Sequence, residues 1–187
     1  SDFIFGADGA GSIIRQTMSK SFKDIDVTEK IIEHGYKELT IPANSDGSHK
    51  LANDALHIWP RKSYMVIALP NLDGTFTCTL FFPIKGKKSF DSLVSKLDVD
   101  NFFTKNFHDL TKITPNLSDQ YFLNPIASLG FVRTNAWKKN NTILIGDACH
   151  ATVPFYGQGM NAGFEDCFLL NNFITKNNGI DNKTISS

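Results

Sequence analysis

The sequence has few arginines, no net charge and no long apolar run, and each shortage argues against a class of function. Only Arg15, Arg61 and Arg133 are arginine among 19 basic residues, which are balanced by 19 acidic ones. This balance gives no indication of a surface for nucleic acid or acidic lipid, so a small neutral or zwitterionic ligand fits better. We find no apolar stretch of roughly 18 residues and no signal-peptide pattern, and so expect no membrane segment in this chain.

Cysteine is also scarce. Cys78, Cys149 and Cys167 are widely separated and lack a neighbouring His or Cys at metal-ligand spacing, so neither a disulfide nor a metal site is predicted. Such residues are typical of small buried apolar positions in a reducing compartment, and we expect a cytoplasmic protein. What the sequence does have is 187 residues that are 41% hydrophobic and 12% aromatic, enough to bury a core.

The N-terminal region predicts a strand, a glycine turn and a helix over residues 2–18, with Ser12 as the helix N-cap. The apolar run of residues 3–5 predicts a buried strand with almost nothing before it, so we expect a truncated N-terminus. From residue 36 onward the pattern predicts antiparallel strands, at 36–41, 55–59, 64–69 and 75–82. Asp73 and Gly74 would supply the positive-φ positions of a hairpin between the last two.

Helices and a further βα pair are predicted in the second half. Apolar residues at helical spacing predict two helices that cover one side of the sheet, marked by Phe90, Leu93, Val94 and Leu97 and then by Phe102, Phe103 and Phe107. A strand at 142–145 and a long helix from Gly159 follow. In that helix, a stripe of Gly163, Cys167, Leu170 and Ile174 should face a sheet. The βα elements thus lie at both ends, with an inserted antiparallel sheet between them.

The stretch from residue 146 to 166, GDACHATVPFYGQGMNAGFED, carries the strongest chemical signal. Asp147 would project from the carboxyl end of a strand, where open α/β sheets bind ligands. Glycines at 157, 159 and 163 let a ligand approach the backbone, and free amides at the helix start stabilise an anion. The arrangement suits a reduced flavin ring, with Asp147 accepting hydrogen bonds from ribityl hydroxyls. The alternative is an ordinary strand-loop-helix connection with Asp147 as a turn residue.

A second aspartate-bearing glycine turn lies near the N-terminus, in DFIFGADGAGSIIR. Asp8 and Gly9 follow the predicted strand, and Arg15 comes one turn into the helix. Alone this is weak evidence, because most such turns are structural. We expect the two turns to converge on one flavin site.

Both stretches resemble the group A flavoprotein monooxygenases. The pair Asp8-Gly9 with Arg15 looks like their DG motif, which serves FAD and the nicotinamide cofactor, and Gly146-Asp147 looks like their GD motif, which contacts the FAD ribityl chain. Their N-terminal GxGxxG element is absent from this sequence. The resemblance therefore implies FAD and NADPH as cofactors, but an isolated chain that is inactive and binds FAD poorly.

Within that superfamily the strings HIWPR (57–61), FTCTLFF (76–82) and PFYGQGMNAGFEDC (154–167) are similar to the kynurenine 3-monooxygenases. The similarity runs to about residue 176. It implies a partial FAD-binding domain from 1–33 and 134–176, a substrate-binding domain over 34–133, and a flexible tail at 177–187.

The resemblance also assigns site residues. Cofactor contacts are implied for Gly146, Asp147, Gly159, Met160 and Asn161, beside those of the DG motif. The substrate pocket is implied to contain Leu56, Ile58, Ile67, Leu69, Thr79 and Phe81, with Pro154, Phe155 and Gly157 bordering the ring. Period-two spacing independently puts the first six on one face within each strand, as a wall suited to an aniline ring. They could equally be ordinary sheet core.

The function expected from the resemblance is hydroxylation of L-kynurenine to 3-hydroxykynurenine with NADPH and O₂. We expect no catalytic base, because neither His57 nor His150 has a partner visible in the sequence. Glu165 and Asp166 are interpreted as complements of the helix dipole. Two alternatives remain: a hydroxylase of another aromatic acid or quinone precursor, and a non-catalytic binding unit. Surface bared by truncation could allow self-association.

Overall fold

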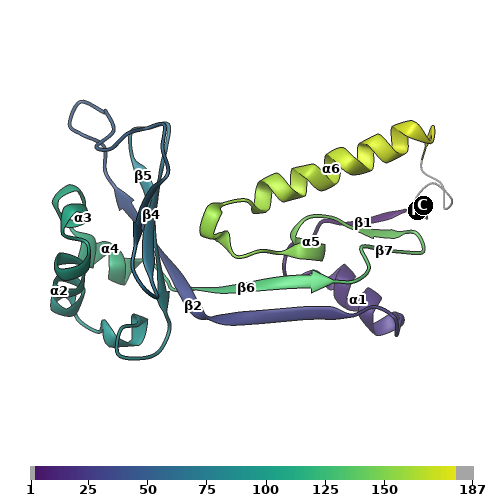
Figure 1. Cartoon of the computed structure of the whole chain (residues 1–187), viewed down its shortest axis with the longest axis horizontal. Coiled ribbons are helices and arrows are strands. Elements are labelled where there is room, and N and C mark those ends of the chain that lie inside the picture. Colours follow the sequence, from purple (N-terminus) through teal and green to yellow (C-terminus); the bar gives the residue numbers. More distant parts are fainter. Residues whose placement is uncertain (1–2, 180–187) are drawn as a thin grey trace. The chain divides into compact units, whose positions relative to one another are not determined.

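The computed structural model describes residues 3–179 as a mixed α/β chain (Figure 1). Its strands are β1 (Ile4–Gly6), β2 (Val27–Ile41), β3 (His57–Pro60), β4 (Met65–Pro70), β5 (Phe76–Pro83), β6 (Ala127–Thr134), β7 (Lys138–Lys139) and β8 (Thr142–Leu144). Its α-helices are α1 (Ile13–Ser21), α2 (Lys96–Asn106), α3 (His108–Ile113), α4 (Leu117–Leu123), α5 (Asp147–His150) and α6 (Gly159–Lys176), and short 3₁₀ turns span Phe90–Ser92 and Pro154–Tyr156. The predicted tail at 177–187 lies mostly outside the described residues.

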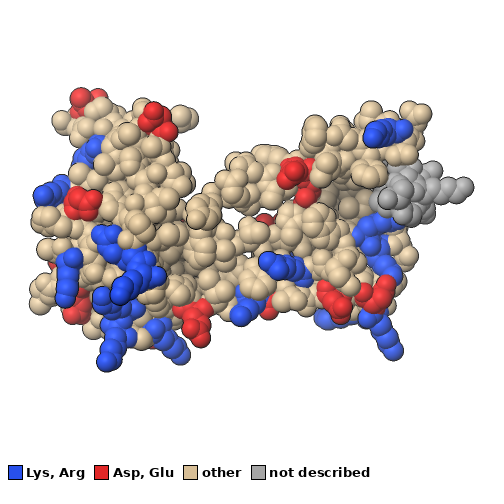
Figure 2. All heavy atoms as spheres, in the orientation of Figure 1, with Lys and Arg blue, Asp and Glu red and all other residues tan. Residues whose placement is uncertain are grey.

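The chain divides into two compact units, one from residues 3–31 and 130–179 and the other from residues 32–129. Acidic and basic side chains both appear on the surface of each unit (Figure 2), as the zero net charge implies. Within the described part of the chain, no helix has the length and apolar character needed to cross a bilayer.

The first unit is built on a three-stranded sheet in the order β1-β8-β7. Strands β1 and β8 are parallel, with Gly6 opposite Leu144. Helix α1 packs on this sheet through Met18, which shares a small core with Leu144 and Cys149. The strand predicted at residues 3–5 is confirmed, but Ile4 and Phe5 are half-exposed instead of buried, because β1 is the edge strand.

Helix α6 begins at Gly159, as predicted, but its predicted stripe is not buried. Cys167 is exposed, which contradicts the expectation of three buried cysteines, whereas Cys78 and Cys149 are buried. Gly163, Leu170 and Ile174 are only partly covered. Apolar spacing alone predicted the stripe. The helix instead has its largest apolar side chains, including Phe164, Phe168 and Phe173, exposed to solvent.

The second unit contains most of an antiparallel sheet in the order β3-β4-β5-β2-β6. Helices α2, α3 and α4 cover one face of this sheet (Figure 1). The core between them combines sheet residues such as Leu80 and Phe82 with Phe103 and Leu110 from the helices, all of them inaccessible to solvent. Burying each such side chain contributes roughly 1.5–3 kcal/mol to folding.

Two local expectations for this unit are corrected. Residues 90–97 do not form one helix: residues 90–92 form a 3₁₀ turn, and Leu97 already belongs to α2. Ser95 caps α2 through its hydroxyl, which accepts from the Asp98 amide. Val94 and Leu97 are consequently exposed. In the β4–β5 hairpin only Gly74 has a positive φ, of 85°; Asp73 instead accepts a hydrogen bond from the Thr75 hydroxyl.

Candidate functional site

The two aspartate-bearing turns leave the same edge of the three-stranded sheet. Because β1 and β8 are parallel, both strands end at that edge, and the Ile145 amide donates to the Gly6 carbonyl at 3.0 Å. The turn with Asp8 and Gly9 follows β1, and the turn with Gly146 and Asp147 follows β8. This is the carboxyl edge, where ligands of open α/β sheets bind.

Arg15 holds the two turns together. Its guanidinium is fully buried and donates to the Ala148 carbonyl at 2.8 Å and to the Ala10 carbonyl at 2.5 Å. The remaining donors engage Glu29, with the shortest N···O distance at 2.6 Å. These contacts make Arg15 an internal support of the site, and its contact with a cofactor stays a prediction.

The Asp8 carboxylate stabilises the start of helix α1 by accepting hydrogen bonds there. Its carboxylate accepts from the Ser12 hydroxyl at 2.5 Å and from the amides of Ile13 and Ile14 at 2.8 and 3.2 Å. The Ser12 hydroxyl accepts from the Arg15 amide at 2.9 Å, which confirms the predicted N-cap. These hydrogen bonds, the Ser12 contact foremost, lower the pKa of Asp8 below its ordinary value.

Asp147 is the free acceptor of the site. The turn before it depends on Gly146, whose φ of 61° and ψ of −140° are essentially restricted to glycine. Asp147 starts the single turn of α5 and is exposed, and no residue from 3 to 179 donates a hydrogen bond to its carboxylate. The carboxylate can therefore accept from the hydroxyls of a ligand.

The loop after α5 leads to an open helix start beside Asp147. Gly157 has a φ of 64°, and no side chain caps the first turn of α6. A Cβ placed on Gly159 would lie 3.9 Å from the Asp147 carboxylate, an ordinary contact distance, which shows that the helix start lies directly beside Asp147. Met160 is largely exposed, Asn161 donates to the Gln158 side chain, and Pro154 and Phe155 lie in the preceding 3₁₀ turn.

These features fit the ribityl chain and ring of a flavin. A free carboxylate matches ribityl hydroxyls, the glycines leave room for close backbone approach, and uncapped amides at a helix start favour the negative charge of a reduced ring. The structure therefore brings together the predicted cofactor residues of the two turns and of the α6 start.

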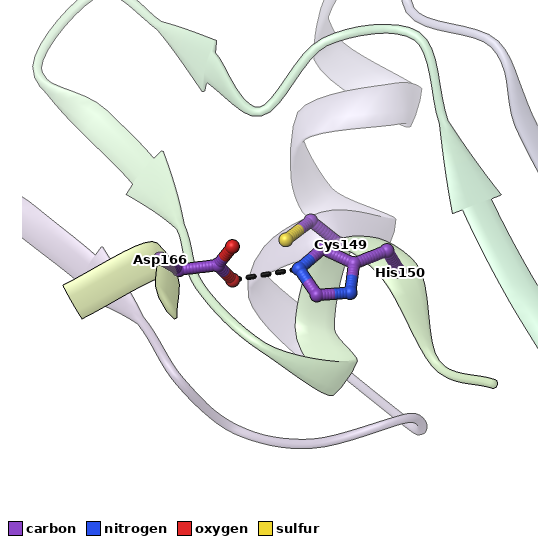
Figure 3. Close-up of side chains that lie close together, drawn as sticks. All are labelled: Cys149, His150 and Asp166. Atoms are coloured by element: carbon purple, nitrogen blue, oxygen red, sulfur yellow. Dashed lines mark hydrogen bonds and ion pairs between the residues drawn. The ribbon is translucent and has the colours of Figure 1, made fainter. Parts of the chain in front are cut away.

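A partner that the sequence did not indicate lies behind this turn. The His150 Nε2 atom is 2.6 Å from Asp166 Oδ2 (Figure 3). The Gly146 amide donates to the same oxygen at 2.8 Å. Both side chains are mostly buried, at 19% and 13% exposure. His150 therefore has a carboxylate partner that the sequence did not reveal, because the two residues are sixteen positions apart. Asp166 also does more than complement the α6 dipole, since it accepts from the Gly146 amide.

Cys149 completes a cluster with these two residues, whose ligand-type atoms all lie within 4.8 Å of one another. Burial raises the pKa of the Cys149 thiol to about 12, and the thiol donates to the Gly146 carbonyl. His150 and Asp166 are paired with each other, so each of the three side chains already has a partner within the protein. The geometry is therefore that of a hydrogen-bonded cluster.

The predicted substrate wall forms one face of the second unit's sheet. Ile58, Ile67 and Thr79 are direct neighbours across β3, β4 and β5. Leu69 and Phe81 belong to the same face, and Leu56 immediately precedes β3. None of the six belongs to the core cluster beneath α2–α4. Leu56, Ile58 and Leu69 are 37–44% exposed, whereas Ile67 and Phe81 are buried. The wall therefore has accessible apolar surface, while its role in binding stays a prediction.

The chain is similar to known proteins over nearly its whole length. The FAD binding domain family matches residues 1–177. The chain is 52% identical over 176 residues to a protein named kynurenine 3-monooxygenase from Flavobacterium johnsoniae, covering 94% of this chain and 39% of that protein. It is 50% identical over 170 residues to one so named from Dictyostelium discoideum, covering 90% and 37%. The chain thus spans about two-fifths of the length of these relatives.

Solved structures show the same fold at low sequence identity. The tetrameric form of 2-methyl-3-hydroxypyridine-5-carboxylic acid oxygenase has a TM-score of 0.69 at 20% identity, over 92% of this chain and 45% of that one. The R204Q variant of Klebsiella pneumoniae HpxO, complexed with FAD, has a TM-score of 0.67 at 18% identity, over 92% and 43%.

Proposed function

We propose that this chain, which belongs to the FAD binding domain family, is part of a monooxygenase. The enzyme hydroxylates L-kynurenine to 3-hydroxykynurenine with NADPH and O₂. The identity of 43–52% to proteins named kynurenine 3-monooxygenase supports the substrate. The observation that carries the proposal is the free Asp147 carboxylate at the same sheet edge as the Asp8 turn, where Arg15 joins the two turns through the Ala148 and Ala10 carbonyls.

The ends of the chain, residues 1–33 and 134–176, would hold FAD. Asp147 accepts hydrogen bonds from the ribityl hydroxyls, and the amides of residues 159–161 stabilise negative charge on the ring. The turn of Asp8 and Gly9 borders the cofactors, with Arg15 beneath it. Bound FAD supplies the redox chemistry, taking electrons from NADPH and activating O₂.

The middle of the chain, residues 34–133, would bind the substrate ring. The wall formed by Ile58, Ile67 and Thr79, with Leu56, Leu69 and Phe81, offers apolar surface and one hydroxyl to a flat aniline ring. The amino group of kynurenine activates the neighbouring ring carbon, so these residues need only orient the ring and exclude water.

The test is NADPH oxidation by the full-length protein that carries this chain. Kynurenine should accelerate oxidation with formation of 3-hydroxykynurenine. The Ile58→Asp variant, which puts a charge on the wall, should raise the KM for kynurenine at least about tenfold. Leu72→Asp is the matched control, because Leu72 lies exposed at the β4–β5 turn and is not one of the six wall residues.

Three results would oppose the proposal. Stimulation by another aromatic acid but not by kynurenine would overturn the substrate. Equal KM values for the two aspartate variants would remove the wall from the pocket. A full-length protein that binds no FAD would overturn the flavoenzyme assignment itself.

A further inference from the structure

Asp166 reaches out of its own helix to the turn that presents Asp147. Its Oδ2 atom accepts from the Gly146 amide at 2.8 Å and pairs with His150 Nε2 at 2.6 Å. In Figure 3 the Asp166 carboxylate from α6 points at the His150 ring of α5. Both partners of Asp166 therefore belong to the segment around Asp147, one directly before it and one three residues after it.

Helix α5 cannot fix this geometry alone. It comprises only residues 147–150, and a single turn fixes more backbone angles than its hydrogen bonds offset. External contacts hold it at three positions: Gly146 and His150 through Asp166, and Ala148 through Arg15. The Trp137 ring also lies against His150, with centroids 4.7 Å apart. Asp147 lies between these held residues and is itself exposed.

A purely structural role is the simpler alternative. Carboxylates in the first turns of a helix complement its dipole, and Glu165 beside Asp166 can do so from an exposed position. Asp166 differs because it is mostly buried, and a buried carboxylate is costly unless its partners satisfy it. Those partners are the two ends of the Asp147 turn, so displacing Asp166 would move that turn.

We propose that Asp166 and His150 are positioning residues of the FAD site, which act on the flavin through the Gly146 turn and the Asp147 carboxylate. The inference rests on the proposed function, since it presumes that Asp147 contacts FAD. It adds that α6 contributes to flavin binding from its second turn as well as from its first.

A double-mutant cycle on the full-length protein tests this, with the dissociation constant of FAD as the measurement. Asp166→Asn should weaken FAD binding about tenfold when Asp147 is present, the scale of one lost charged hydrogen bond. In the Asp147→Asn background the same change should weaken it less than about threefold, because the group being positioned is already altered. His150→Gln, which keeps a donor, should bind FAD more tightly than His150→Phe.

Glu165→Gln is the matched control on the same helix and should leave FAD affinity unchanged. Circular dichroism and unfolding midpoints establish that each variant folds. If Asp166→Asn does not fold, the same cycle is measured with His150→Gln and His150→Phe in its place. Equal losses in both Asp147 backgrounds, or no loss in a folded variant, would overturn the inference while leaving the proposed function intact. A wild-type protein that binds no FAD would instead overturn the proposed function.

Discussion

A single guanidinium joins the two turns of the candidate FAD site. Arg15 is inaccessible to solvent and satisfies the carbonyls of Ala10 and Ala148, which lie 138 positions apart in the sequence (148 minus 10). Glu29, about half exposed, balances its charge. Arg15, which the sequence assigned to the DG motif, therefore supports the site from inside the protein.

Replacing Arg15 by Met should lower the free energy of unfolding by about 2–4 kcal/mol, because two buried carbonyls would lose their donor. Chemical denaturation of the full-length protein measures this. Arg133→Met is the matched control, since Arg133 is exposed and should cost less than about 0.5 kcal/mol. If both substitutions cost the same, the guanidinium bridge does not stabilise the site.

Individual residues of the site were predictable where a backbone rule fixes them. Ser12 as N-cap and the turn at Gly146 follow from local chemistry, and the structure confirms both. The pairing of His150 with Asp166 could not be predicted, because it depends on how α6 packs against the preceding turn. The hydrogen bonds of Arg15 to backbone carbonyls could not be predicted either, because they also depend on tertiary packing.

At the scale of elements, the junction of β8, α5 and α6 depends on two glycines with different requirements. Gly146 and Gly163 face each other, and a Cβ on Gly163 would lie 3.7 Å from the Gly146 Cα, which is an ordinary contact. Gly146 instead has a backbone conformation that side chains rarely tolerate, with a φ of 61°. Only one of the two positions therefore demands glycine.

Gly146→Ala should destabilise the protein by about 1–3 kcal/mol through backbone strain, and should weaken FAD binding because the Asp147 turn shifts. Gly163→Ala should be neutral or stabilising by up to about 1 kcal/mol, since alanine favours a helix interior. Thermal unfolding and FAD titration of the two variants check this. A more damaging effect at 163 than at 146 would contradict the backbone argument.

Strands with clear apolar alternation were predicted, whereas β6 was not. Alternation located β3, β4 and β5 to within a few residues, whereas β2 begins at Val27, nine positions before the predicted start. The early part of β2 is mostly exposed and includes Glu29 and Glu33, so it lacks an apolar pattern. Helix α4 was missed because its seven residues are too few to show a helical period.

At the scale of the whole molecule, the two ends of the chain form one compact unit and the middle forms another. The ends supply both glycine turns, and the middle supplies the apolar sheet face opposite the helices. The sequence predicted βα patterns at both ends, with antiparallel strands and then helices between them. The parallel pairing of β1 with β8 is what makes one site from residues near each terminus.

The most direct test is a crystal structure of the full-length protein with FAD and kynurenine. We predict that the ribityl hydroxyls lie within hydrogen-bond distance of the Asp147 carboxylate, and that the kynurenine ring contacts Ile58, Ile67 or Thr79. A flavin bound away from Asp147, with the turns of Asp8 and Gly146 empty of ligand, would contradict the account.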